Sequence, residues 1–590
     1  MENPTSFYKK QLEKHTSQAK ALYKQLMTLS TMRLLVFLMS ALGVYMFFSV
    51  KNAVILIVFA GIALFLFLLK RYVLVKTTHQ LEKALIKVNE EELSIATGNF
   101  HDRPDGSAFQ NPKHYYSLDI DLFGRGSFFQ YINRTQIAEG TKTLAEAFLA
   151  NDINAIEARQ DAIKELSDKP EWRQHYQATA SLIDTDTSTK TIVSWLQSYT
   201  SFLPTIAKWL PKVFSGLSLV FIGLTFLSII HWKYVIIWFV VGLIISARFV
   251  KNISELSSNS DKVKATFKQY ASLLNEIENE NFATALLTEK QRDIKLKDEK
   301  ASLIFKRFSG VLEMLDNRNN ILWAFLGNGF FLADMFSAFK IEQWIATYAN
   351  KTADWFEVVA FFDAYNTLGN YVFNVPDFVF PTITNANNSI INAKNLGHPL
   401  LEKSKRITSD LQLDNEQFFI VTGANMAGKS TFLRTVSLHI VMANIGLPIC
   451  ATSSDYAPIK LITSMRTSDS LTDDSSYFFS ELTRLKFIVD QITREPYFII
   501  LDEILKGTNS TDKAIGSKKF VEKLVAGNAT GIIATHDLSL CEIEKDLEEV
   551  KNYYFDAQII NDELFFDYKL KQGICQNMNA SFLLKKMEIV

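Results

Sequence analysis

The stretch that decides the fold is Val421–Arg434, with the sequence VTGANMAGKSTFLR. The apolar residues that lead into it predict a buried parallel strand, and the residues after its second glycine predict a helix. Between them lies a loop with the spacing G-x-x-x-x-G-K-S, from Gly423 to Ser430. Glycine lets backbone N–H groups close around phosphate oxygens where a Cβ would obstruct them. The strand–loop–helix order argues against a chance glycine loop and predicts a nucleotide-binding phosphate loop.

Individual residues of this loop have expected tasks. The loop amides and the helix N-terminus favour negative charge. Lys429 can reach the β- and γ-phosphates of a nucleotide, and the hydroxyl of Ser430 can ligate Mg²⁺. The candidate nucleotide-binding residues of the loop are Gly423, Asn425, Met426, Ala427, Gly428, Lys429, Ser430 and Thr431.

An acidic pair follows a second apolar run. The run is Tyr497–Leu501, and Asp502 and Glu503 come directly after it. A carboxylate at the end of a buried strand suits the Mg²⁺-side aspartate of a nucleoside triphosphatase, so Ser430 and Asp502 are the predicted Mg²⁺ ligands. Glu503 is then placed to polarise a water for attack on the γ-phosphate. A helix capping box or a surface acidic pair is the alternative.

A third apolar run, Gly531–Ala534, is followed closely by His536. A histidine after a third strand can sense the γ-phosphate. Taken alone, such a histidine is more often a hydrogen-bonded scaffold residue, but its spacing after the other two motifs favours the functional interpretation. We therefore predict Glu503 and His536 as the catalytic residues.

The motifs TGANMAGKSTFLR, LDEILKGTNSTD and ATHD resemble the ATPase domain of the MutS family, which belongs to the ABC-type ATPases. The resemblance implies an ATPase that binds ATP and Mg²⁺ in an α/β P-loop domain. Asn395–Glu402 is similar to the family segment that lies near the adenine. His398 and Ile407 are therefore candidate adenine contacts, and Arg406 stands where relatives often have an aromatic residue.

A further segment, Ser464–Leu482, resembles the signature loop of the family, which reaches the nucleotide of the opposite subunit. By that match Ser476 contacts the γ-phosphate in trans, and the working unit is a homodimer. Asp474 stands where many relatives have glycine. The alternative is that Ser475 and Ser476 cap the helix that starts near Tyr477.

Four apolar runs outside this domain predict transmembrane helices in two hairpins. Each is close to the length that crosses a hydrocarbon core of about 30 Å. The predicted spans are 34–50, 53–69, 213–230 and 234–250. Basic residues flank both pairs on the same side, which favours a multi-pass protein of the cytoplasmic membrane with its soluble parts in the cytoplasm. Buried helices of a soluble core are the alternative to a partnership with the lipid bilayer.

The breaks inside the two predicted hairpins are Lys51-Asn52 and His231–Lys233. The soluble segments around them predict an all-α lever domain that resembles the MutS core, with paired helices at Phe267–Leu287 and Glu299–Leu315. The predicted domains are a basic segment with the first hairpin (1–75), the first part of the helical domain (76–205), the second hairpin (206–250), the second part of the helical domain (251–375) and the ATPase domain (376–590).

Composition limits the partners and the compartment. The 590 residues carry a net charge of −1, so no global basic field indicates nucleic acid, although a local basic patch is compatible with it. The three cysteines, Cys450, Cys541 and Cys575, are far apart in the sequence. This sparse, odd set predicts a reducing compartment without a disulfide framework.

The resemblance covers roughly 118–190 and 250–590. Only about 115 residues precede Leu118, so we expect neither a mismatch-recognition domain nor a connector domain. Two functions remain. The first is a membrane-anchored DNA-handling ATPase of the mismatch-repair class, for which DNA is a partner. The second uses the same ATPase engine for a mechanical or scaffolding task at the membrane, without mismatch recognition.

Overall fold

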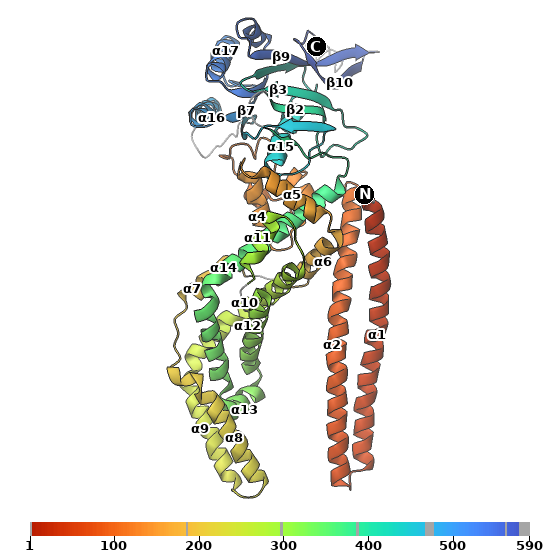
Figure 1. Cartoon of the computed structure of the whole chain (residues 1–590), viewed down its shortest axis with the longest axis vertical. Helices are drawn as coiled ribbons and strands as arrows, with labels where there is room; N and C mark the ends of the chain where they lie inside the picture. The colour runs from red at the N-terminus through yellow and green to blue at the C-terminus, as the bar shows by residue number, and fades with distance from the viewer. Residues whose placement is uncertain are drawn as a thin grey trace.

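The structure is a computed structural model that describes residues 3–183, 187–295, 299–384, 389–466, 477–560 and 563–576. The molecule is elongated, with the β-sheets at one end and two helical hairpins at the other (Figure 1). A lever of helices connects the sheets to the hairpin that lies later in the chain, and the N-terminal hairpin stands beside the lever. Ser476 and Asp474 lie outside the described residues.

The first hairpin consists of α1 (Pro4–Met46) and α2 (Lys51–Ala96). Both helices continue far beyond the predicted spans, because a stripe of buried side chains extends them on the side of the sheets. Large apolar side chains are exposed from Leu34 on α1 to Leu74 on α2. The predicted break at Lys51-Asn52 was wrong. The chain reverses at 47–50, where Val50 N donates to Phe47 O at 2.9 Å, and Lys51 already begins α2.

The second hairpin consists of α8 (Leu210–Phe226) and α9 (Trp232–Ala247), which start and end a few residues before the predicted spans. The predicted break at His231–Lys233 was also misplaced. The turn lies at 227–231, and the His231 side chain caps α9 by accepting from Lys233 N at 3.3 Å. A further apolar helix, α13 (Ile321–Phe331), packs against this hairpin and was not predicted.

Among the described residues, α1 and α2 are long and apolar enough to cross a membrane. Two bent pairs pass the same test when each pair is counted as one span. These are α9 with α10 (Val250–Asn279), bent by 66°, and α13 with α14 (Ala333–Asn374), bent by 83°. By length and composition alone, the described part of the chain therefore has two to four candidate spans.

The lever is helical throughout. Its elements are α3 (Phe128–Ile132), α4 (Ala138–Leu149), α5 (Ile156–Ser167), α6 (Pro170–Ser181), α7 (Thr189–Ser198), α10 (Val250–Asn279), α11 (Ala285–Asp293), α12 (Ala301–Asp316) and α14 (Ala333–Asn374), with short 3₁₀ turns η1 (Ser107–Phe109), η2 (Thr205–Lys208) and η3 (Asn317–Asn319). The single helix predicted at Phe267–Leu287 is split between α10 and α11. Glu165 accepts the backbone N–H groups of Ala283 and Thr284, both at 2.8 Å, and so fixes the break before α11.

The open end of the first hairpin is joined to the end of α14 by buried polar groups. Glu92 of α2 accepts a hydrogen bond from Arg134 Nε at 2.5 Å. The side chains of Asn370 and Asn374 on α14 also donate to Glu92, at 2.9 and 3.0 Å. Tyr8 of α1 donates to Asn374 at 2.7 Å. We call Tyr8, Glu92, Arg134, Asn370 and Asn374 the polar joint.

The C-terminal part is an α/β domain with two sheets. The larger sheet has the order β10-β9-β4-β8-β7-β6, with only β10 antiparallel to its neighbour. Its strands are β4 (Phe418–Gly423), β6 (Lys460–Ser464), β7 (Tyr497–Asp502), β8 (Thr530–Ala534), β9 (Val550–Ile560) and β10 (Glu563–Gln572). The predicted strands at 418, 497 and 531 are confirmed, and β9 and β10 form a terminal hairpin. The helices of the domain are α15 (Lys429–Ile445), α16 (Tyr477–Ile492), α17 (Ser510–Ala526) and the 3₁₀ helix η4 (Leu538–Lys545).

The smaller sheet was not predicted. Its strands are β1 (Thr382–Ile383), β2 (Ser389–Leu396), β3 (Ser409–Asp414) and β5 (Ser453–Tyr456), in the order β1-β5-β2-β3. It is mixed, because β1 pairs with β5 in parallel and the other pairs are antiparallel. The loop between β2 and β3 carries His398 and Ile407, so this sheet positions both candidate adenine contacts.

Candidate active site

Three neighbouring parallel strands end at one edge of the larger sheet. The register pairs Val421 of β4 with Ala534 of β8, and Ala534 with Asp502 of β7. The predicted phosphate loop, the acidic pair and His536 follow these strand ends, so the three sequence motifs meet. They line a cavity of about 600 Å³ between the larger sheet and the loop that joins β2 to β3.

The loop from Gly423 to Lys429 has the backbone that its glycines predict. Gly428 has φ 104°, in the left-handed region that favours glycine, and it precedes α15 directly. Lys429 is buried, and its Nζ donates to the carbonyl oxygens of Gly423 at 2.8 Å and Ala424 at 3.0 Å. Burial lowers the pKa of Lys429, although the carboxylates of Asp502 and Glu503 oppose that shift.

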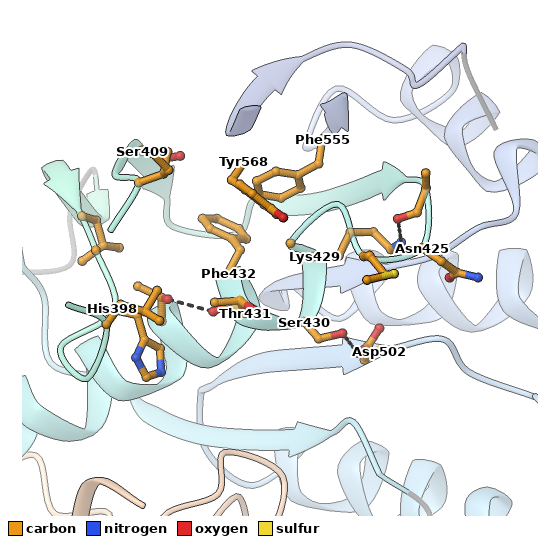
Figure 2. A pocket seen from close by; sticks show the side chains of 18 of the residues that line it. His398, Ser409, Asn425, Lys429, Ser430, Thr431, Phe432, Asp502, Phe555 and Tyr568 are labelled. Atoms are coloured by element: carbon orange, nitrogen blue, oxygen red, sulfur yellow. Dashed lines mark hydrogen bonds between the residues drawn. The ribbon is translucent and has the colours of Figure 1, made fainter. Parts of the chain in front are cut away.

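Ser430 and Asp502 face each other across the cavity floor (Figure 2). Ser430 Oγ donates to Asp502 Oδ2 at 2.7 Å. One hydroxyl and one carboxylate are a suitable donor set for Mg²⁺, which keeps several waters and takes its remaining ligands from phosphate oxygens. No group of three or more His, Cys, Asp or Glu side chains suited to a metal occurs in the part of the chain that the structure describes.

Glu503 and His536 form a close pair. His536 Nε2 lies 2.9 Å from Glu503 Oε1 and 3.1 Å from Lys429 Nζ. A single ring nitrogen cannot donate to the carboxylate and accept from the ammonium at once. We assign the proton to Nε2, because Lys429 already has two carbonyl acceptors, whereas the Lys506 ammonium lies 4.0 Å from the Glu503 carboxylate, beyond hydrogen-bond distance. This hydrogen bond is the largest cause that lowers the pKa of Glu503 to about 2.

Glu481 of α16 holds the backbone next to Glu503 and was not predicted. Its carboxylate accepts the N–H groups of Leu505 and Lys506. Glu503 and Leu505 have φ 51° and 60°, which are costly for residues other than glycine by about 1–3 kcal/mol each. Such strain persists only when surrounding contacts hold it. The sequence did contain a signal for this residue, because Glu481 lies in Ser464–Leu482, the segment that resembles the signature loop of the family. Within that segment, a role was assigned to Ser476 alone.

The other end of the cavity has an apolar lining. His398 and Ile407, the two candidate adenine contacts, both line it, and burial lowers the pKa of His398 to about 4, so its ring is neutral at pH 7. Arg406 does not line the cavity. Its guanidinium donates to Leu401 O at 2.6 Å and to Cys450 Sγ at 2.9 Å, and so stabilises the loop between β2 and β3.

Three aromatic residues of this wall were missed by the sequence interpretation, namely Phe432, Phe555 and Tyr568. The Phe432 and Phe555 rings have centroids 5.6 Å apart. Tyr568 lies at a register shift in β10 with φ 52°, and its ring packs against Gly428, where an added Cβ would come within 3.1 Å of the ring. Only the alternation of aromatic residues in the terminal hairpin could have indicated them, and that pattern does not say which face meets the nucleotide loop.

The remaining loop residues differ in exposure. Met426 is exposed at the cavity mouth with φ 66°, and Asn425 and Thr431 also line the cavity. Ala427 is fully buried in the core and does not line it. Ala427 therefore anchors the loop to the hydrophobic core.

A mainly helical N-terminal part thus carries a C-terminal α/β domain with a polar cavity at the carboxyl edge of its parallel strands. Residues 419–586, which begin on β4, match the family model of MutS domain V.

Curated relatives match about a third of the chain. Human MutS protein homolog 4 is 32% identical over 225 residues, which are 36% of this chain and 23% of that protein. The DNA mismatch repair protein MutS of Methanococcoides burtonii is 33% identical over 206 residues, 33% of this chain and 23% of the relative. The protein of the same name from Bacteroides fragilis is 29% identical over 208 residues, 33% of this chain and 24% of the relative. The matches span less than a quarter of the length of these relatives.

Proposed function

We propose that the chain is a membrane-anchored ATPase of the MutS type, with ATP bound in the cavity described above. The observation that carries the proposal is the convergence of Lys429, the Ser430–Asp502 pair and the Glu503–His536 pair on one cavity. These residues come from three separate strand ends, and each has the chemistry that phosphoryl transfer needs. The match to MutS domain V and the relatives named for mismatch repair support it.

In this proposal the loop from Gly423 to Thr431 surrounds the phosphates. Lys429 exchanges its two carbonyl acceptors for β- and γ-phosphate oxygens. Ser430 and Asp502 hold Mg²⁺, which when bound neutralises charge on the phosphate oxygens. The two side chains already lie within hydrogen-bond distance of each other, so both would reach the same cation.

Glu503 is the proposed general base. It takes a proton from a water that attacks the γ-phosphorus, the bond from that phosphorus to the bridging oxygen breaks, and ADP leaves. The low pKa of Glu503 keeps its carboxylate charged throughout the physiological range. His536 orients the carboxylate through Nε2, and its position also allows contact with the γ-phosphate.

The adenine occupies the apolar end of the cavity. His398 and Ile407 contact it from the smaller sheet, and Tyr568 offers a ring face from β10. Neutral imidazole and phenol rings suit stacking on a base, because every base has a π-face.

The site is completed by a second copy of the chain. Ser476 of one subunit contacts the γ-phosphate bound by Lys429 of the other, so closure of the dimer depends on ATP. The test mixes two inactive variants, Lys429→Ala and Ser476→Arg. In the mixed dimer one site has both intact residues, so we expect partial recovery of activity on mixing. Normal hydrolysis by Ser476→Arg alone contradicts the trans contact.

The membrane is the proposed location. The exposed apolar surface of α1 and α2 and that of α8 and α9 lie at the same end of the molecule, away from the sheets (Figure 1). Both hairpins can therefore enter one bilayer while the α/β domain remains in the cytoplasm. Beyond Arg71, α2 has 25 further residues, which extend about 38 Å at 1.5 Å per residue.

DNA handling in mismatch repair is the first candidate task, because two of the relatives are named DNA mismatch repair protein MutS. A mechanical or scaffolding task at the membrane is the second, and the two apolar hairpins favour it. The test measures ATP hydrolysis by the purified full chain with no DNA, homoduplex DNA and mismatched duplex. A DNA-handling ATPase changes its rate with duplex and loses that response steeply as salt rises. If neither DNA changes the rate of hydrolysis, the mechanical or scaffolding task at the membrane is favoured.

A further inference from the structure

α13 presents an apolar face that neither the nucleotide site nor the lever uses. Ile321, Leu322, Phe325 and Leu326 are 73%, 74%, 56% and 52% exposed. Residues spaced i, i+1, i+4 and i+5 share one side of a helix. The stretch 319–333 contains no charged residue. The exposed face is therefore a continuous apolar strip, of the kind that is removed from water by another apolar surface or by lipid.

The opposite face of α13 is fixed to the second hairpin. A Cβ on Gly242 of α9 would overlap the carbonyl oxygen of Gly329, so the two backbones touch at this point. Phe330 O accepts from Ser218 Oγ of α8 at 2.6 Å. The rings of Phe239 and Phe330 have centroids 5.0 Å apart. α13 is therefore fixed to α8 and α9 and shares the environment of this hairpin.

Both ends of α13 are on the same side. Arg318 precedes the helix and Asp334 follows it, yet their side chains pair, with Arg318 Nε 3.5 Å from Asp334 Oδ2. Leu332 has φ 49°, and the chain bends there by 83° into α14. The eleven residues of α13 extend about 16 Å, roughly half of a hydrocarbon core. A straight helix of this length with both ends on one side lies along the surface of a bilayer and does not cross it.

We propose that α13 lies at the surface of the same bilayer as α8 and α9, as an interfacial helix whose exposed face contacts lipid acyl chains. The inference rests on the membrane placement of α8 and α9 in the proposed function and extends it to a segment outside the four predicted spans. Continuity argues for lipid as the cover, because α13 packs against α8 and α9, whose large apolar side chains are also exposed. The Arg318–Asp334 pair then marks the aqueous boundary.

The test uses single cysteines on the full chain, with the three native cysteines, all buried, replaced by alanine. Leu322→Cys and Phe325→Cys report on α13. Ile236→Cys, on the exposed side of α9, reports on the hairpin, and Leu303→Cys is a matched exposed leucine on the lever helix α12. Each is labelled with a bimane fluorophore and reconstituted into phosphatidylcholine vesicles that contain lipids with a doxyl quencher at acyl carbon 5 or 12.

We expect quenching at Leu322→Cys and Phe325→Cys to exceed that at Leu303→Cys at least threefold, and carbon 5 to quench more than carbon 12. Quenching at Ile236→Cys with none on α13 overturns this inference and leaves the hairpin in the membrane. No quenching at Ile236→Cys contradicts the membrane placement itself. Disulfide dimers of the unlabelled Leu322→Cys variant, together with no quenching of the labelled one, mean that a second copy covers α13, which also overturns the inference. Variants count only if their unfolding midpoints match that of the cysteine-free parent.

Discussion

The contact between His536 and Glu503 sets the chemistry of the proposed site at the scale of single residues. The hydrogen bond at 2.9 Å lowers the pKa of Glu503, although partial burial of the carboxyl opposes it. A base with so low a pKa is charged at any physiological pH, but it is also a weak proton acceptor. Lengthening of the His536 contact when nucleotide binds would strengthen the base at the moment of reaction.

Tyr568 makes the sharpest prediction about the nucleotide base. Its ring forms one wall of the apolar end of the cavity, and loss of an aromatic ring that stacks on a base costs about 1–3 kcal/mol. Tyr568→Ala should therefore raise KM for ATP about tenfold and leave kcat nearly unchanged. Tyr568→Phe keeps the ring and should behave as the unaltered protein. Steady-state kinetics of both variants decide it, and an unchanged KM in Tyr568→Ala places the adenine elsewhere.

The polar joint dominates at the scale of elements, because it fixes the first hairpin to the helix that leads into the α/β domain. Burial alone would raise the pKa of Glu92, but the charge and hydrogen bonds of Arg134 outweigh burial, so this pKa lies below its ordinary value. An ion pair that is nearly inaccessible to solvent transmits movement well, because breaking it leaves an unpaired charge inside the protein.

Glu92→Gln should destabilise the chain by about 3–5 kcal/mol at pH 7, since Arg134 loses its buried partner. A lowered carboxyl pKa adds stability that is present above the unfolded pKa and is lost as pH falls through the folded pKa. The difference in unfolding midpoint between the unaltered protein and Glu92→Gln should therefore shrink below about pH 4.5. Thermal unfolding from pH 7 to pH 4 measures it.

The matched control for this experiment is Glu91→Gln. Glu91 is the next residue on α2 and pairs with Arg103 at 3.1 Å, but a third of its side chain is exposed. A partly exposed pair contributes about 0–1 kcal/mol, so this variant should unfold almost as the unaltered protein does. Equal effects of the two substitutions, or a difference for Glu92→Gln that stays constant down to pH 4, would show that the joint is not a buried ion pair.

Elements with a strong local pattern could be predicted from the sequence. The apolar runs before Gly423, Asp502 and His536 each gave a strand, and the loop spacing gave the start of α15. The smaller sheet could not be predicted in this way, because β1 and β5 are only two and four residues long and pair across more than 70 residues. α13 was missed because its eleven residues are too few for a span, and only its packing on α9 gives it a place.

The same distinction between local sequence patterns and tertiary contacts applies to the site residues. Lys429, Ser430 and Asp502 belong to local motifs, and the fold brings them together as predicted. Glu481 and Tyr568 act through tertiary contacts, one on the backbone after Glu503 and the other on Gly428. No local spacing indicates such contacts. Ser476 lies outside the described residues, so its role stays a prediction.

At the scale of the whole molecule, the two hairpins point away from the sheets and end on the same side (Figure 1). The first hairpin reaches the α/β domain through the polar joint, and the second reaches it through α14 and the other lever helices. Closure of an ATP-bound dimer would then act on both hairpins at once. We expect the two membrane segments to move relative to each other during the ATPase cycle.

Topology provides the test of membrane orientation. Phe48 lies at the exposed tip of the first hairpin, and Lys113 lies in an exposed loop near the α/β domain. With both hairpin bases and the nucleotide site in the cytoplasm, Phe48→Cys should react with a membrane-impermeant thiol reagent on intact cells. Lys113→Cys should react only after the cells are opened. The opposite labelling pattern reverses the orientation.

The central claim is that the cavity hydrolyses ATP, and one measurement tests it most directly. ATP binding and turnover are measured side by side for the full chain, Lys429→Ala, Glu503→Gln and the control Glu495→Gln, whose carboxyl lies just before β7, at the end of that strand away from the cavity. We predict that Lys429→Ala loses ATP binding, that Glu495→Gln is unaffected, and that Glu503→Gln binds ATP normally while its turnover falls at least about a hundredfold. Turnover by Glu503→Gln at the rate of the unaltered protein would contradict the account.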